Sequence, residues 1–157
     1  MKPAIGLSDT NRNGVLKLLA PLLADEYVLY TKTRNYHWNV VGPQFNDLHK
    51  FFQAQYEEFD DFVDDVAERM RQLGGRSPGT LAEFTKAARL KEHSGQRHNA
   101  RVMLTALLAD HEKDRVRGRI GRGTRVREWS RLAAACRARA RESPTGAALC
   151  PHALPPC

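Results

Sequence analysis

Two histidines and two carboxylates in the first half of the chain have side chains suited to binding a metal ion. His37 and His49 lie on either side of a break at residues 42–43, and Asp64 and Glu68 follow four residues apart. Four residues is about one helical turn, so the two carboxylates share one face of a helix. Mixed imidazole and carboxylate ligands suit iron, manganese or zinc, and the coordination positions they leave open suit redox chemistry on iron.

The spacing of these four residues excludes a site within one chain. Asp64 lies 15 residues after His49 on what reads as one helix. At the rise of an α-helix this is about 22 Å, whereas a metal–ligand bond is about 2 Å. If two copies of the hairpin pack antiparallel, the histidines of one copy lie beside the carboxylates of the other. We therefore expect two equivalent metal sites in a two-fold symmetric dimer.

A structural interpretation of the same residues stays open at this stage. Interfacial histidines are often simply hydrogen-bonded, and an acidic run is usually a solvated helix face. We assign five further carboxylates to such a face: Glu57, Glu58, Asp60, Asp61 and Asp65. Trp38 is interpreted as a packing residue. Four histidines have no evident partner and receive no role: His93, His98, His111 and His152.

Apolar periodicity predicts an all-α fold. A stripe with steps of three or four residues runs through the segment after Pro43, and Gly74 and Gly75 end it. The expected helices cover residues 9–39, 44–73 and 96–113, with a short connecting helix over 81–88. No alternating strand pattern or internal repeat is evident. Two long antiparallel helices joined by a short loop are typical of a helical bundle.

The composition changes near residue 114. Residues 1–113 carry 15 basic and 15 acidic side chains, whereas residues 114–157 hold ten Arg, no Lys and three acids, and so carry the whole net charge of +7. All three cysteines, Cys136, Cys150 and Cys157, also fall there. We divide the chain into a helical domain over 1–113 and an Arg/Cys/Pro-rich tail over 114–157, with a weak helix expected over 124–142. A change of reading frame near residues 113–115 and a genuine basic tail both explain this change.

No run of about 18 apolar residues indicates a membrane span, and the first residues lack the apolar core of a secretory leader. We therefore expect a cytoplasmic protein with no membrane partner.

Two segments resemble the Dps family, the DNA-binding proteins from starved cells, which are miniferritins of the ferritin-like superfamily. They are "TKTRNYHWNVVGPQF", with a second histidine 12 residues after the first, and "YEEFDDFVDDVAERMRQLGG". The resemblance covers about residues 10–113. It implies a ferritin-like four-helix bundle, here with a degraded or replaced fourth helix. It also implies an iron site between two-fold-related subunits, with His37 and His49 from one and Asp64 and Glu68 from the other.

The resemblance further implies a ferroxidase that oxidises Fe(II), preferentially with hydrogen peroxide, and stores ferric iron in a dodecameric cage, protecting DNA. It implies non-specific DNA as a second partner and association with the nucleoid. The N-terminal residues supply only Lys2 and Arg12 for that contact, so the basic tail is the other candidate surface. Two alternatives remain: a DNA-compacting protein without catalysis, and a truncated product that does not assemble.

Overall fold

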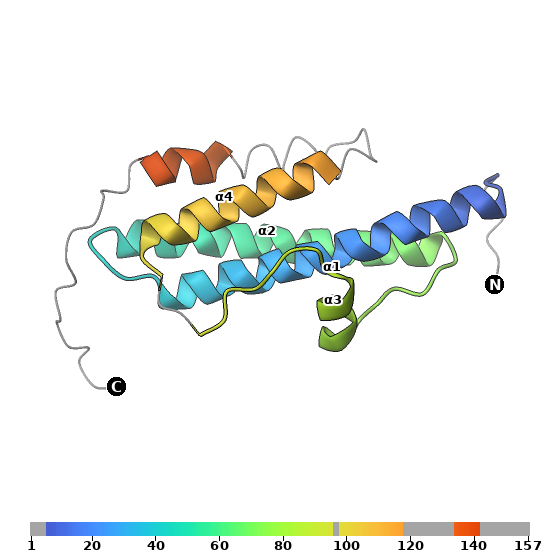
Figure 1. Cartoon of the computed structure of the whole chain (residues 1–157), viewed down its shortest axis with the longest axis horizontal. Helices are drawn as coiled ribbons and strands as arrows, with labels where there is room; N and C mark the ends of the chain where they lie inside the picture. The colour runs from blue at the N-terminus through green and yellow to red at the C-terminus, as the bar shows by residue number, and fades with distance from the viewer. Residues whose placement is uncertain (1–5, 96–97, 118–133, 142–157) are drawn as a thin grey trace.

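The computed structural model describes residues 6–95, 98–117 and 134–141, and these residues are helical or loop, with no strand among them. Two long helices, α1 (Asp9–Asn39) and α2 (Phe45–Gln72), run antiparallel along the molecule (Figure 1). The short α3 (Leu81–Ala87) and then α4 (Ala100–Arg117) follow, and residues 134–141 form one further helical segment. None of the described helices is long and apolar enough to cross a membrane.

Local sequence explains where the long hairpin begins and turns. The hydroxyl of Ser8 accepts a hydrogen bond from the Asn11 amide at 3.3 Å and caps α1. The helix continues through Pro21, although a proline removes one backbone hydrogen bond from a helix interior. Gly42 makes the turn into α2 with a φ of 119°, a conformation that a side chain would strain.

The end of α2 uses two adjacent glycines for two different reasons. Gly74 adopts a φ of 75°, the left-handed conformation common just after a helix. Gly75 has no such requirement, but a Cβ there would lie 2.5 Å from a methyl carbon of Leu16 on α1. The second glycine therefore allows the close approach of the α2 terminus to α1.

One face of α2 supplies much of the core. Its buried apolar side chains recur every three or four residues and pack against α1 and α4: Leu48, Phe52, Phe59, Phe62, Val66 and Met70. From α4, Met103, Leu104 and Leu107 join the same core and are at most 1 % exposed. The expected helix over 96–113 thus begins at Ala100, four residues later than the apolar pattern suggests.

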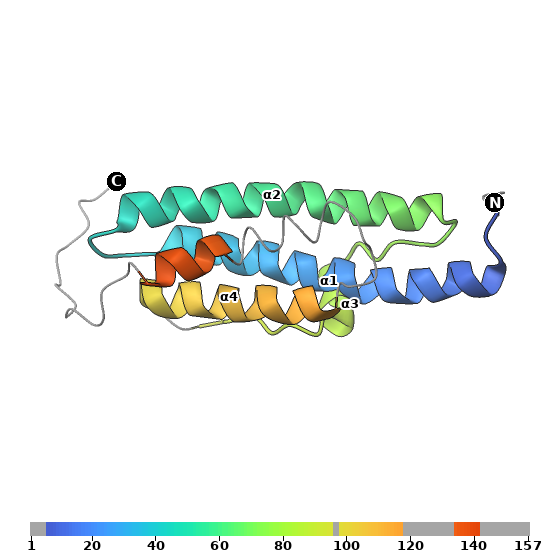
Figure 2. The same cartoon turned by 90° about the horizontal axis from the view of Figure 1, so that it is seen from above.

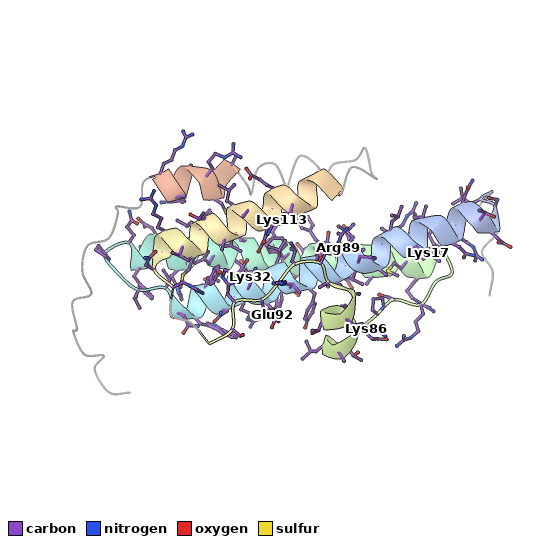
Figure 3. All side chains as sticks on the ribbon, viewed as in Figure 1. Lys17, Lys32, Lys86, Arg89, Glu92 and Lys113 are labelled. Atoms are coloured by element: carbon purple, nitrogen blue, oxygen red, sulfur yellow. The ribbon has the colours of Figure 1, made fainter. Side chains whose placement is uncertain are left out.

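Two ion pairs attach the later elements to α1. Asp25, fully buried, accepts hydrogen bonds from the backbone amides of Arg89 and Leu90 at 2.6 and 3.0 Å, and from the Arg89 side chain. Lys32 pairs with Asp110 of α4 at 2.5 Å, and both are almost fully buried. Figure 3 shows Lys32, Lys113 and Arg89 along the line where α1 meets α4 and the connection before it.

Residues 134–141 cover part of the position of a fourth bundle helix. Seen from above, this segment lies beside α4 and next to the first half of α2 (Figure 2). Cys136 is fully buried in the main core, and the amide nitrogen of Gln55 on α2 donates to its sulfur at 3.2 Å. The segment is also held by an ion pair between Arg137 and Glu112. The rest of the weak helix expected over 124–142, and most of the tail, lie outside the described residues.

Candidate metal centre

The turn between α1 and α2 brings His37 and His49 together. His37 lies in the last turn of α1 and His49 in the second turn of α2. Their rings stack with centroids 3.6 Å apart and an interplanar angle of 23°. His37 is 8 % exposed and His49 is partly exposed. The antiparallel hairpin therefore gathers both predicted imidazoles at one point, beside the turn.

Each imidazole is oriented by the backbone of the other helix. His37 Nδ1 lies 2.8 Å from the carbonyl oxygen of His49, and His49 Nδ1 lies 2.9 Å from the carbonyl oxygen of His37. A carbonyl oxygen only accepts hydrogen bonds, so both Nδ1 atoms carry the proton. In the neutral ring this leaves a lone pair on Nε2, which is the form of histidine that binds a metal ion.

Aromatic rings enclose the histidine pair within the hairpin. Phe45 stacks on His49 at 5.0 Å between centroids, and Tyr56 meets His37 edge-on at 5.2 Å. Beside the pair, Trp38 is 66 % exposed and Val41 is 65 % exposed. Trp38, predicted to be a packing residue, is thus mostly open to solvent in a single chain. The surroundings fix the rings and leave an apolar surface next to them.

The predicted carboxylates are at the other end of α2. Asp64 and Glu68 are exposed and one turn apart, and the nearer of the two, Asp64, is about 22 Å along the axis from His49. The structure thus joins the two histidines and keeps the two acids away from them. Across residues 6–95, 98–117 and 134–141, no three His, Cys, Asp or Glu side chains are grouped closely enough to hold a metal ion.

The structure gives partners to three histidines that sequence patterns left without a role. His93 Nδ1 lies 2.6 Å from the Tyr36 hydroxyl, and the His93 and His98 rings are 4.9 Å apart between centroids. Burial, followed by the charges of Lys32 and His98, lowers the pKa of His93. The repeat of two histidines five residues apart was the only signal of this contact. His152 lies outside the described residues.

Two further buried titratable groups, His111 and Cys136, serve packing. His111 on α4 is fully buried and stacks on Phe59 at 5.6 Å, and burial lowers its pKa to about 4. Burial likewise raises the pKa of the Cys136 thiol to about 11. A neutral thiol is a poor nucleophile and a poor metal ligand, so Cys136 acts as a small apolar side chain.

The long antiparallel helix pair, its histidine corner and the helices packed along it define a ferritin-like helical protein. The model of the ferritin-like domain family matches residues 16–117. An uncharacterized low temperature-induced protein of Nostoc sp. is 47 % identical over 109 residues, which are 69 % of this chain and 61 % of that protein. The chain thus spans less than two thirds of that relative.

More specific matches come from proteins with a narrower name. The DNA protection during starvation protein of Helicobacter pylori is 38 % identical over 96 residues, covering 61 % of this chain and 67 % of that one. The structure of the Dps protein from Vibrio cholerae, described as a member of a broad superfamily of ferritin-like diiron-carboxylate proteins, superposes with a TM-score of 0.71 at 28 % identity over 90 % of this chain and 89 % of that one. This chain belongs to the Dps family.

Proposed function

We propose that this chain is a ferroxidase subunit whose iron site is completed by a second copy. The observation that carries the proposal is the reciprocal pair of bonds from the Nδ1 atoms of His37 and His49 to backbone carbonyls. These bonds fix both rings in the metal-binding tautomer before any ligand arrives. A histidine pair serving only as structure needs no such matched orientation beside an exposed apolar surface.

Two copies supply the missing half of the site. In an antiparallel pair, Asp64 and Glu68 of one α2 lie opposite the histidines of the other, and the two-fold axis repeats the arrangement. The exposed apolar side chains at the turn, Trp38, Val41 and Phe45, then become buried at the contact. The proposal therefore explains both the separation of the ligands and the exposure of large apolar residues.

The reaction proposed is the oxidation of Fe(II) by hydrogen peroxide. Fe(II) is the substrate, bound through neutral imidazole nitrogens and carboxylate oxygens. Two Fe(II) ions each lose one electron, and the two electrons, together with two protons from solvent, cleave the O–O bond of one hydrogen peroxide to give two water molecules. The carboxylates stabilise the more highly charged Fe(III) product, and the neutral imidazoles keep Fe(II) binding moderate. Loss of both reagents together prevents hydroxyl-radical damage to DNA.

The ferric product is proposed to be stored inside a closed assembly. A hollow homo-oligomer with closed symmetry would retain a ferric precipitate in its interior. A dodecamer is the assembly expected from the family, with the two-chain iron site as its repeated unit. The relatives named for DNA protection are consistent with this role.

A complementation experiment tests the two-chain site. The variant His37→Ala/His49→Ala keeps the acids, and the variant Asp64→Ala/Glu68→Ala keeps the histidines. Each alone should lose peroxide-dependent Fe(II) oxidation. After unfolding and refolding together in equal amounts, half of the dimers are mixed, and each mixed dimer has one intact site of two. About a quarter of the wild-type activity should therefore return.

The control is the same pair of variants refolded separately and then mixed without denaturant. Activity that does not return on co-refolding would contradict a shared site. Full activity in either variant alone would favour the alternative of a DNA-compacting protein whose histidines are structural.

A further inference from the structure

Arg34 is a fixed positive charge beside the histidine pair. It precedes His37 and Trp38 by three and four residues on α1, so all three share a helix face. Its guanidinium carbon lies 5.2 to 5.6 Å from the ring centroids of Tyr30, Tyr56 and Trp38. The same Tyr56 meets His37 edge-on. The charge is therefore held by the ring that borders the proposed iron site.

The contacts of Arg34 within its own chain are aromatic. Its Nη1 donates to the Tyr30 hydroxyl, and its buried Nε has no hydrogen-bond partner among the described residues. No ion pair joins Arg34 to a carboxylate in the part of the chain that the structure describes. Stacking on three rings removes rotamer freedom and leaves the charge unneutralised. A guanidinium fixed in this way is prepared for an anion from outside the chain.

Four carboxylates near the end of α2 carry negative charge that is not balanced by a neighbouring cation in the described part of their own chain. Asp60, Asp61, Asp64 and Glu68 are exposed on neighbouring turns of α2, with no described cation paired to them. When two copies place the histidine end of one against this end of the other, the metal-free interface concentrates negative charge. Without iron these carboxylates repel one another, and the nearest fixed cation would be Arg34 of the facing copy.

We propose that Arg34 is the counter-ion of the metal-free centre: it pairs with a carboxylate of the second copy when iron is absent and releases it when Fe(II) binds. This inference rests on the two-chain site proposed above. It assigns Arg34 a positioning role that acts through the carboxylate. The ion pair stabilises the empty interface, and Fe(II) must displace it, so Arg34 also limits the affinity of the site for divalent cations.

Removing the charge of Arg34 should therefore weaken metal-free association and strengthen metal binding. A residue that only packs against its neighbours would not change these two quantities in opposite directions. Arg34→Met keeps an apolar stem over the rings and removes the charge. Metal-free association of Arg34→Met should be about three- to tenfold weaker than wild type and less sensitive to salt. Its affinity for Zn(II), which is not oxidised and so reports binding alone, should be higher by a similar factor. Arg34→Lys, which keeps the charge, should stay near wild type in both.

Lys50→Met is the matched control. Lys50 is an exposed cation directly after His49 on α2. If net charge alone mattered, this variant would reproduce both effects, and the proposal requires that it reproduce neither. Sedimentation at 50 and 500 mM salt measures association, and calorimetric titration measures zinc affinity. Circular dichroism verifies the helix content first, and Arg34→Gln provides a second neutral variant that keeps a donor to Tyr30.

The outcomes separate the two proposals. Wild-type zinc affinity and association in both neutral variants would overturn the role of Arg34 and leave the shared site intact. Weaker zinc binding in both would also overturn it, because the arginine would then support the metal-bound state. Wild-type protein that binds no zinc, together with failed complementation, would contradict the shared site itself.

Discussion

The fully buried imidazole of His111 makes stability depend on pH. It is fully buried against Phe59, and burial lowers its pKa from 6.5 to about 4. The folded state therefore disfavours the protonated form. Stability from this group is complete above pH 6.5 and is lost as pH falls toward 4, because the unfolded chain takes up the proton first. The difference amounts to up to about 3 kcal/mol.

Urea unfolding at a series of pH values checks this prediction. His111→Leu, of similar size, should keep most of the stability at pH 7.5 and lose part of the decrease between pH 6.5 and 4. A decrease of the same size in the variant would mean that other groups cause it.

Residue types and spacing predicted four metal ligands and a site shared by two chains, and both stay predictions. They did not predict how the rings of His37 and His49 are held, because the acceptors are backbone carbonyls across a turn whose geometry depends on Gly42. They also missed the aromatic contacts of Arg34, which come from two different helices. Side-chain contacts between helices depend on rotation and register, which periodicity leaves undetermined.

At the level of elements, the connection after α3 depends on Asp25. Its carboxylate accepts from two backbone amides and from Arg89, and its side chain is 1 % exposed. Asp25→Ala leaves buried donors without an acceptor and should cost about 3 kcal/mol of folding free energy. Chemical denaturation measures it. Arg76→Ala, which breaks the exposed pair with Glu83, is the control and should change stability little.

Helix positions could largely be predicted, because α2 has strong apolar periodicity and the two long helices have clear end signals in Ser8, Gly42 and Gly74. The start of α4 could not be predicted in the same way. The residues before Ala100 continue the polar pattern without a signal that marks where the helix begins. The sequence predicted only a weak helix over 124–142 and did not predict that residues 134–141 pack into the core. Alternating Arg and Ala give a weak apolar face, but the small thiol of Cys136 fits fully into the core next to Gln55.

Thiol chemistry tests whether residues 134–141 belong to the bundle. With Cys150→Ser and Cys157→Ser as background, Cys136 is the single thiol. Because burial raises its pKa to about 11, a thiol reagent at pH 8 should react more than about 100-fold slower with native protein than in urea. Ala134→Cys with Cys136→Ala places the thiol at an exposed position of the same segment and should react fast. Rapid native reaction of Cys136 would show that the segment is not docked.

For the whole molecule, the proposed two-chain site predicts that assembly and iron oxidation are lost together, because each chain would supply only half of the ligands. Trp38→Glu places a charge on the exposed apolar surface that the second copy is proposed to cover. Each chain should keep its helix content, since Trp38 is 66 % exposed and outside the core. Self-association should be lost, and peroxide-dependent Fe(II) oxidation should fall at least about tenfold, because a buried unpaired charge costs well over 1.4 kcal/mol.

Val102→Glu makes the same change on another helix, α4, at a residue 41 % exposed. It should leave the dimer and its oxidation rate unchanged. Light scattering measures mass and stopped-flow absorbance measures oxidation on the same samples. A Trp38→Glu protein that is monomeric yet oxidises iron at the wild-type rate would place a complete site within one chain. That result would contradict the separation of about 22 Å on which the shared site depends.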